Sequence, residues 1–112
     1  MDTFSALSDP TRRNILEMLA SSGGLPATDI YAHFPASHPA ISQHLQVLRK
    51  ANLVRVEKKA QYRIYRINPE PIHELELWVK QMTAVWDERF SALDEVLQEE
   101  QSKPQQEPDT GP

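Results

Sequence analysis

Residues 37–50 have the sequence SHPAISQHLQVLRK, whose pattern predicts a helix with one apolar face. Ile41, Leu45 and Leu48 recur at steps of four and three residues, which places them on the same side of a helix. Asparagine tolerates the left-handed backbone conformation that closes many helices, so we expect this helix to end near Asn52. The stretch therefore supplies an amphipathic helix around which the rest of the fold can be placed.

The opposite face of this helix carries small, polar and basic side chains. Glutamine can bind adenine with two hydrogen bonds, serine and histidine can contact base edges, and arginine and lysine can bind phosphate groups. The helix is expected to begin at Ser37, and its positive N-terminus there favours an anion. We expect this face to enter the major groove of duplex DNA through Ser37, His38, Pro39, Ser42, Gln43, Gln46, Arg49 and Lys50. His44 lies nearer the apolar face and is expected to pack there.

Two further helices are predicted on the N-terminal side of this stretch. The first begins at Ser8 or Asp9, either of which can act as an N-cap, and ends at the glycine pair 23–24. A shorter helix follows Pro26 and ends before the proline-containing connection 34–37. That connection is so short that the two helices it joins must cross, as they do in a helix-turn-helix.

Residues 53–67 change from helical to strand character. The segments 53–58 and 62–67 are rich in β-branched and aromatic residues, and residues 59–61 connect them. The pattern predicts a β-hairpin whose basic tip can reach phosphate groups or the minor groove. The tip residues expected to contact DNA are Lys58, Lys59, Tyr62 and Arg63. This order of elements predicts a winged helix-turn-helix, which is a mainly α fold with a small β-hairpin.

Residues 71–98 form one long helical pattern without an internal glycine or proline. A helix of this length spans roughly 40 Å, whereas a core built from the preceding residues is about 25–30 Å wide. We therefore expect part of its apolar face to stay uncovered within one chain, and a second copy of the same helix is the simplest cover. The apolar positions recur at steps of four and three residues and are Leu75, Val79, Met82, Trp86, Phe90, Leu93 and Leu97.

Length and composition favour one small domain followed by a tail. The 112 residues suit a single domain, which we place at residues 1–98. Residues 99–112 are rich in Gln, Glu and Pro and are expected to form a disordered acidic tail. No stretch approaches the length of a membrane span and no signal-peptide pattern opens the sequence, so we expect a cytoplasmic protein.

The net charge of −4 conceals an uneven distribution along the chain. Residues 1–68 contain nine basic and five acidic residues, whereas residues 69–112 contain three basic and eleven acidic residues. Within the first part, residues 37–66 contain seven basic residues and one acid, Glu57. Because phosphate groups respond to the local field rather than to the net charge, this segment is the expected DNA-binding surface.

Several other functional classes lack the residues that they need. The chain contains no cysteine, which excludes disulfides, thiolate metal ligands and a cysteine nucleophile. Its four histidines are scattered without an i, i+4 pair, so no metal site and no cofactor is expected. Ser42, Gln43 and His44 are consecutive on a helix and point in different directions, so they cannot form a hydrolytic triad. We expect a binding protein rather than an enzyme.

Two stretches resemble the ArsR family of regulators. Residues 4–16, FSALSDPTRRNIL, resemble the opening of these proteins. Residues 40–54, AISQHLQVLRKANLV, resemble their recognition helix and the step into the wing. The resemblance covers about residues 4–98. Within the family, the chain is similar to the SdpR-like branch, whose long C-terminal helix carries a Trp-x-x-x-Phe-like pattern, here Trp86 and Phe90.

This resemblance implies a metal-independent, homodimeric repressor that binds an inverted-repeat operator and controls its own gene. It also implies that Arg12 and Arg13 correspond to the basic pair of the family and take part in DNA binding. The first and last helices would form the dimer interface, with contacts from Phe4, Leu7, Leu75, Val79, Met82, Trp86, Phe90 and Leu93.

The chain departs from the metal-sensing members of the family. Residues 28–33 stand where those members carry a Cys-x-Cys type motif, and His73 is followed eleven residues later by Ala84 instead of a second ligand. Arsenic or zinc sensing is therefore not expected. Two alternatives stay open. One is a winged-helix module that binds proteins, and the other is a sensor of the same fold that responds to a metal or to an apolar molecule beside Trp78 and Trp86. No effector is identified.

Overall fold

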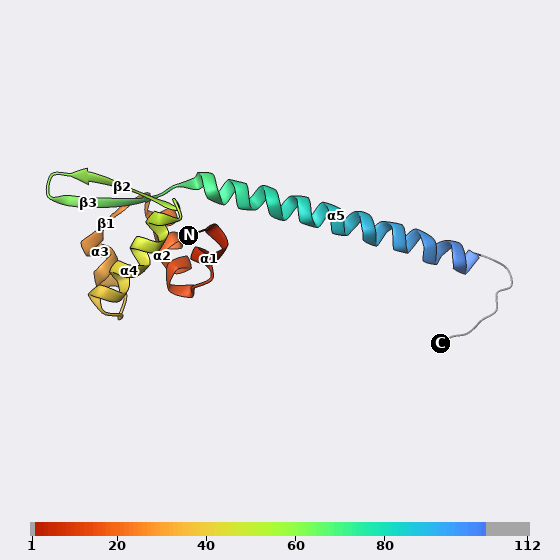
Figure 1. Cartoon of the computed structure of the whole chain (residues 1–112), viewed down its shortest axis with the longest axis horizontal. Coiled ribbons are helices and arrows are strands. Elements are labelled where there is room, and N and C mark those ends of the chain that lie inside the picture. Colours follow the sequence, from red (N-terminus) through yellow and green to blue (C-terminus); the bar gives the residue numbers. More distant parts are fainter. Residues whose placement is uncertain (1, 103–112) are drawn as a thin grey trace. The chain divides into compact units, whose positions relative to one another are not determined.

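The structure is a computed structural model that describes residues 2–102 (Figure 1). Contacts divide the chain into two units, with the boundary inside the last helix between Leu75 and Glu76. The boundary lies inside one continuous helix, so the single domain expected over residues 1–98 stays a prediction. The elements are, in order, α1 (Thr3–Leu7), α2 (Pro10–Ser22), β1 (Leu25–Pro26), α3 (Ala27–His33), α4 (His38–Lys50), β2 (Val54–Lys59), β3 (Tyr62–Ile67) and α5 (Pro69–Ser102).

The first unit contains a three-stranded antiparallel sheet with the strand order β1-β3-β2. β2 and β3 form the predicted hairpin (Figure 1). Lys59 lies opposite Tyr62 at its tip. β1 pairs with the other edge of β3 and places Leu25 opposite Tyr65. The sequence pattern does not predict β1, because two residues are too few to show a strand period.

The core of the first unit lies between helices α2, α3 and α4 and the sheet. Full burial of one leucine or isoleucine side chain contributes about 1.5–3 kcal/mol. The three apolar residues of α4 predicted to face inward are all part of this core, so the predicted orientation of the helix is confirmed. The buried apolar residues are Ala6, Ile15, Leu16, Leu19, Ile30, Ile41, Leu45, Leu48, Ala51, Leu53, Val54 and Tyr65.

The helix ends of the first unit follow the capping residues in the sequence. Asp9 caps α2, because its side chain accepts a hydrogen bond from the backbone N–H of Arg12 at 3.1 Å. Gly23 closes the same helix in the left-handed conformation, with φ at 82°. Ser37 caps α4 through its hydroxyl oxygen. Asn52 follows α4 with φ at 62°, which is the left-handed conformation predicted for this position.

α1 is a short helix that the sequence pattern does not predict. It contains five residues, which are too few to show a helical period. Asp2 caps it by accepting a hydrogen bond from the Ser5 N–H at 2.7 Å. Ala6 is fully buried against the core, so tertiary packing holds this turn of helix in place.

α5 begins two residues earlier than predicted and ends four residues later. Asn68 caps it, since its Oδ1 accepts a hydrogen bond from the N–H of Glu70 at 3.4 Å. The helix continues to Ser102, so residues 99–102 of the expected tail are helical. The remainder of that expected tail, residues 103–112, lies outside the described residues.

The second unit, as far as it is described, consists of the part of α5 from residue 76 onward. Its large apolar side chains are exposed, because a single helix cannot bury its own face. Over residues 2–102, no helix is long and apolar enough to cross a membrane.

Candidate nucleic-acid interface

The eight residues assigned to DNA binding around α4 are all exposed. They share this face because Ile41, Leu45 and Leu48 turn the other side of the helix into the core. The face contains no acidic residue, and its two basic residues lie in the last turn. It therefore offers hydrogen-bonding groups along its length and positive charge at its C-terminal end. The eight residues are Ser37, His38, Pro39, Ser42, Gln43, Gln46, Arg49 and Lys50.

His38, at the start of α4, stacks on Tyr31 of α3. Their ring centroids are 3.6 Å apart and the ring planes differ by 20°. The stack spans the turn between the two helices and limits the orientations that the exposed imidazole can adopt. Tyr31 is a residue of this surface that the sequence did not indicate, because no sequence signal shows which rings meet across a turn.

The tip of the β2–β3 hairpin concentrates positive charge. Lys58 lies directly opposite Arg63 in the antiparallel register, and Lys59 lies opposite Tyr62. All four side chains are exposed. Like charges directly opposite each other destabilise a hairpin, so a bound anion would relieve a cost that the free protein carries. Ala60 turns the tip with φ at 55°, a conformation that favours glycine.

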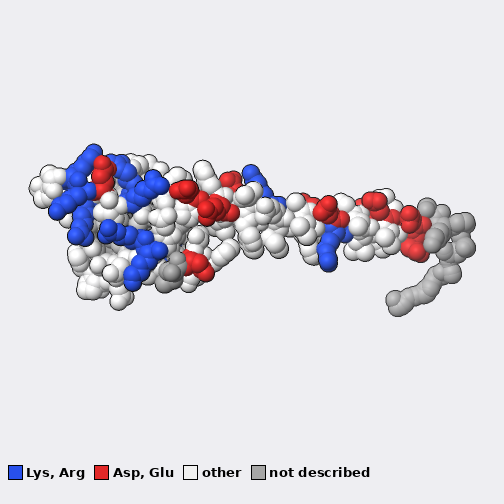
Figure 2. Space-filling view, turned by 45° about the horizontal axis from the view of Figure 1, so that its top comes forward, with Lys and Arg blue, Asp and Glu red and all other residues white. Residues whose placement is uncertain are grey.

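The basic residues of the first unit fall into a paired and an unpaired group. Arg66 lies 3.1 Å from Oε1 of Glu57, and Arg55 lies 3.6 Å from Oε2 of Glu70. Figure 2 shows that Lys and Arg gather over the first unit, whereas Asp and Glu follow α5. Within residues 2–102, the basic residues of α4 and the hairpin that have no carboxylate partner are Arg49, Lys50, Lys58, Lys59 and Arg63. These five are the same basic residues that the sequence pattern assigns to DNA.

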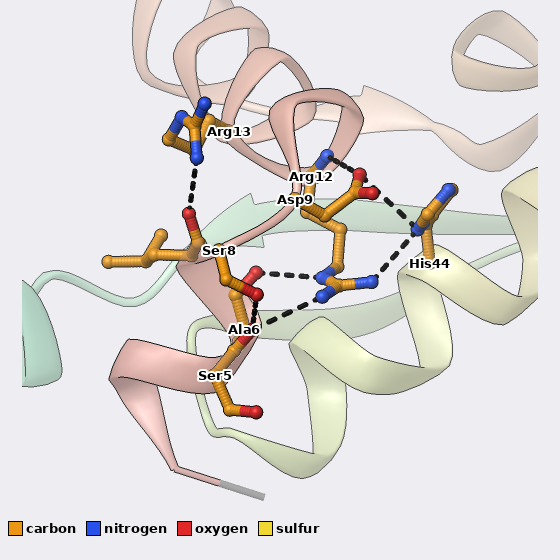
Figure 3. Close-up of polar contacts among 8 residues, drawn as sticks. Ser5, Ala6, Ser8, Asp9, Arg12, Arg13 and His44 are labelled. Carbon is orange, nitrogen blue, oxygen red and sulfur yellow. Dashed lines mark hydrogen bonds and ion pairs between the residues drawn. The ribbon is translucent and has the colours of Figure 1, made fainter.

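Arg12 points its guanidinium group into the first unit rather than outward (Figure 3). Its Nε donates to the carbonyl oxygen of Ala6 at 2.7 Å, and its Nη2 donates to that of Ser5 at 3.2 Å. Its Nη1 lies 3.2 Å from Nδ1 of His44. These contacts occupy all three nitrogens, so the structure places Arg12 apart from the exposed basic residues with which the family resemblance grouped it.

Arg13 is exposed, and its Nη1 donates to the carbonyl oxygen of Leu7 at 2.6 Å (Figure 3). It therefore closes the C-terminal end of α1, where helix carbonyl groups lack intrahelical partners. The two neighbouring arginines thus have different environments. Arg12 is half-buried, whereas Arg13 retains donors that face solvent.

His44 of α4 is half-buried and faces the start of α2, which agrees with its expected place near the apolar face of α4. Its contacts are polar, however, because its Nδ1 faces Arg12 and lies 3.8 Å from Oδ2 of Asp9. Partial burial of Asp9 acts to raise the pKa of its carboxyl group. The hydrogen bond from the Arg12 N–H, the positive charge of Arg12 and the attraction of His44 once its ring is protonated outweigh it, so the pKa of Asp9 lies below its usual value.

The residues assigned to the dimer interface lie in both units. Phe4 and Leu7 belong to α1, and Leu75 is the last residue of the first unit. Leu7 and Leu75 are partly buried, whereas Phe4 is 55% exposed. The remaining residues lie along one helix in the second unit and have exposed fractions of 46–61%. They are Val79, Met82, Trp86, Phe90 and Leu93.

Known proteins share this chain's sequence and fold. A model of a helix-turn-helix domain matches residues 7–57. The transcriptional repressor SdpR of Bacillus subtilis is 38% identical over 78 residues, which cover 70% of this chain and 86% of that protein. The arsenic resistance transcriptional regulator ArsR2 of Pseudomonas putida is 36% identical over 84 residues, which cover 75% and 70% of the two chains. The chain belongs to the ArsR family.

Solved structures of ArsR-family proteins have the same fold. An ArsR-like transcriptional regulator from Rhodococcus sp. RHA1 superimposes with a TM-score of 0.74 at 30% sequence identity, covering 83% of this chain and 87% of that one. The predicted winged helix-turn-helix fold and the predicted family are therefore confirmed. ArsR-family proteins are DNA-binding transcriptional regulators and not enzymes, which agrees with the class expected from the sequence.

The side chains available to bind a metal in this ArsR-family chain are limited to His, Asp and Glu. Cysteine is absent from the sequence. In the described part of the chain, no group of three or more His, Asp or Glu residues is arranged to hold a metal. The described residues of a single chain therefore do not fit a metal centre.

Proposed function

We propose that this protein is a metal-independent transcriptional repressor that binds an inverted-repeat DNA operator as a homodimer. In each subunit α4 enters the major groove, and the tip of the β2–β3 hairpin binds the flanking backbone. The two copies of α4 would contact half-sites about 34 Å apart, which is one turn of B-DNA. Repression would follow because a protein bound at a promoter blocks polymerase.

The distribution of unpaired positive charge carries this proposal. The exposed face of α4 and the hairpin tip hold five basic residues without a carboxylate partner, whereas Arg55 and Arg66 are paired with acids. Arg49 and Lys50 suit phosphate groups beside the major groove, and the exposed amides of Gln43 and Gln46 suit adenine edges. Phosphate contacts would supply affinity, and base contacts would supply sequence selectivity.

The apolar face of α5 supports the homodimer. Val79, Met82, Trp86, Phe90 and Leu93 recur at steps of three and four residues, which is the spacing by which paired helices interlock. Trp86 and Phe90 already contact each other edge to face, with ring centroids 5.9 Å apart. A soluble protein rarely leaves so long an apolar stripe in water, and a second copy presents the same stripe.

Two finer parts of the proposal rest on the relatives and on composition. Repression follows the printed name of the Bacillus subtilis relative, a transcriptional repressor. Metal independence rests on the missing cysteines and on the lack of a suitable ligand cluster in residues 2–102. We further propose, from the resemblance to the SdpR-like branch alone, that the repressed gene is its own.

A DNA titration tests this function. The purified full chain would be titrated against a labelled duplex from upstream of its own gene and against a scrambled duplex, at two salt concentrations, with and without EDTA. If three of the five unpaired cations in each subunit of a dimer bind phosphate, the logarithm of the association constant should fall against log salt with a slope of about −5. We expect selective, salt-sensitive binding that EDTA leaves unchanged.

Other outcomes would identify which part is wrong. Loss of binding in EDTA would contradict metal independence and favour the metal-sensor alternative. Tight binding to neither duplex would contradict autorepression, and selection from random duplexes would then show whether another operator exists. If binding to every duplex is weak and insensitive to salt, the fold serves a protein partner instead.

A further inference from the structure

We propose that Arg12 and His44 form a polar joint that positions α4 for selective DNA binding, and that a proton on His44 opens this joint. The inference rests on the proposed function, because the position of α4 matters to selectivity only if α4 contacts DNA. It makes Arg12 and His44 positioning residues and predicts that sequence selectivity depends on pH.

Arg12 connects three helices of the first unit. Two of its nitrogens hold the end of α1, since Nε donates to the Ala6 carbonyl at 2.7 Å and Nη2 donates to the Ser5 carbonyl at 3.2 Å. Its third nitrogen, Nη1, reaches His44 of α4 at 3.2 Å (Figure 3). Because Arg12 itself belongs to α2, one side chain links α1, α2 and α4.

The chemistry of the contact determines the protonation state of the His44 ring. A guanidinium group carries only donors, so Nδ1 of His44 must accept the hydrogen bond. An imidazole that accepts at Nδ1 is neutral and carries its proton on Nε2. A second proton, placed on Nδ1, would remove the acceptor and bring two positive groups into contact. The joint therefore requires a neutral His44.

Asp9 offers the protonated ring a different partner. Its Oδ2 lies 3.8 Å from the same Nδ1, which is within ion-pair distance. That oxygen also accepts the backbone hydrogen bond that caps α2. A proton on His44 would thus exchange Arg12 for Asp9 as the partner of Nδ1. Over the described residues, these are the charged groups within hydrogen-bond or ion-pair distance of the ring, and both come from α2 and its cap.

The joint adjoins the face that contacts bases. Arg12 and His44 line a cleft of about 250 Å³ together with Gln43, Gln46 and Val47 of α4. Both glutamines are assigned to base contacts, and both share the helix backbone with His44. A two-hydrogen-bond contact with a base has strict geometry, so a displacement of α4 by about 1 Å would weaken it. Opening of the joint should therefore lower selectivity.

Two measurements on the full chain test the joint. Each is made at about pH 7.5 and at about pH 5.5. The first is the ¹⁵N NMR signal of the His44 ring and of the α4 amides in the free protein. The second is the ratio of dissociation constants for a scrambled and a selected duplex at constant ionic strength. A new positive charge strengthens binding to every duplex, so only a change in the ratio reports positioning.

The variant His44→Gln separates positioning from charge, because glutamine can still accept from Arg12 but does not titrate. His33→Gln is the matched control, since His33 is an exposed histidine of α3 that makes an edge contact with Phe34 and lies outside the joint. We expect the selectivity ratio of the wild type and of the control to fall about tenfold on acidification, within the usual range of coupling between sites. The ratio of His44→Gln should stay constant.

The possible results test the joint and the proposed function separately. An Nδ1 signal that shows a bound proton at about pH 7.5 overturns the joint, whatever the DNA measurement gives. A neutral acceptor ring combined with a constant selectivity ratio in the wild type overturns its role in positioning α4. A pH effect that persists in His44→Gln also contradicts the proposal. Equal affinity for all duplexes at every pH overturns the proposed function itself, and this inference falls with it.

Discussion

The side-chain amide of Asn68 donates a hydrogen bond from Nδ2 to the carbonyl oxygen of Asn52, at 2.8 Å. Asn68 is 1% exposed and is the buried polar residue of the core. Its backbone N–H donates to the Leu53 carbonyl at 2.8 Å, and its Oδ1 caps α5. One residue therefore joins the end of α4, the end of β3 and the start of α5, so the helix proposed to contact DNA is tied to the start of the helix proposed to form the dimer.

Replacement of Asn68 by alanine should lower the free energy of unfolding by about 1–3 kcal/mol, because it removes a fully buried side chain that donates to the Asn52 carbonyl and caps α5. Urea denaturation at one fixed protein concentration would measure the change. Asn52→Gly is the matched control, since it keeps the accepting carbonyl and suits the positive φ at that position. If both variants are as stable as the wild type, the hydrogen bond does not stabilise the fold.

Asp9, the N-cap of α2, should stabilise the folded protein both through its hydrogen bond and through its charge. Asp9→Ala removes the cap and should lower the unfolding free energy by about 1 kcal/mol. Asp9→Asn keeps an accepting oxygen but removes the charge that faces His44 and Arg12. We expect it to be less stable than the wild type at neutral pH.

The stability difference between Asp9→Asn and the wild type should shrink in acid. The folded-state pKa of Asp9 is lowered, so its charge stabilises the fold above the ordinary aspartate pKa, and this stabilisation is lost as the pH falls through the folded pKa. Thermal unfolding of both proteins from neutral to acidic pH would measure this. A gap that widens as the pH falls below the ordinary aspartate pKa would contradict the assignment, whereas protonation of His44 at higher pH would widen the gap through its pairing with Asp9.

Gln43 and Lys59 should have different effects on DNA binding. Gln43→Ala should cost on the order of 1–3 kcal/mol on the selected duplex and relax preference at one base position. Lys59→Ala should weaken binding to all duplexes similarly and reduce the salt slope by about 1. Titrations with single-base variants of the duplex at two salt concentrations would separate them. Identical behaviour of the two variants would refute the division between base and phosphate contacts.

Removal of the single acid from the basic segment should strengthen DNA binding without changing selectivity. Glu57 binds Arg66 on the hairpin, and both Nε and Nη2 of Arg66 lie 3.1 Å from Oε1. Glu57→Gln would leave Arg66 held by the Gly23 carbonyl and raise the local positive charge. We expect a few-fold gain on selected and scrambled duplexes at low salt. Glu17→Gln, at an exposed acid of α2, is the control and should show no gain.

Trp86→Ala should weaken the proposed dimer, because Trp86 is 61% exposed in the single chain and contacts Phe90 at the centre of the apolar stripe. Sedimentation equilibrium or mass photometry over a dilution series would give the dissociation constant. Glu88→Ala is the matched control on the same helix. An unchanged mass of the Trp86 variant at low concentration would remove this residue from the interface.

Most of the proposed DNA-binding surface could be predicted from local sequence. The period of Ile41, Leu45 and Leu48 is enough to orient α4, and capping by Asp9 and Ser37 is a property of residue type and position. The hairpin also follows from β-branched residues on both sides of a short turn. These features depend on neighbours in the chain, and this is why a single sequence predicts them.

Contacts between distant segments could not be predicted in this way. Nothing near Arg12 in the sequence shows that its guanidinium group binds Ser5, Ala6 and His44 instead of facing solvent. The stack of Tyr31 on His38 similarly depends on how two helices meet.

The sequence by itself determined the order of the longer elements, the apolar face of α4, the basic hairpin and the lack of cysteine ligands. Hydrophobic period, capping and composition act locally, so they are visible without coordinates. Only the tertiary structure decided which basic residues stay unpaired, that Arg12 holds α1 and α4 together, and that Asn68 ties α4 to α5. Those outcomes depend on atoms that meet within hydrogen-bond distance after folding, and linear spacing does not determine such distances.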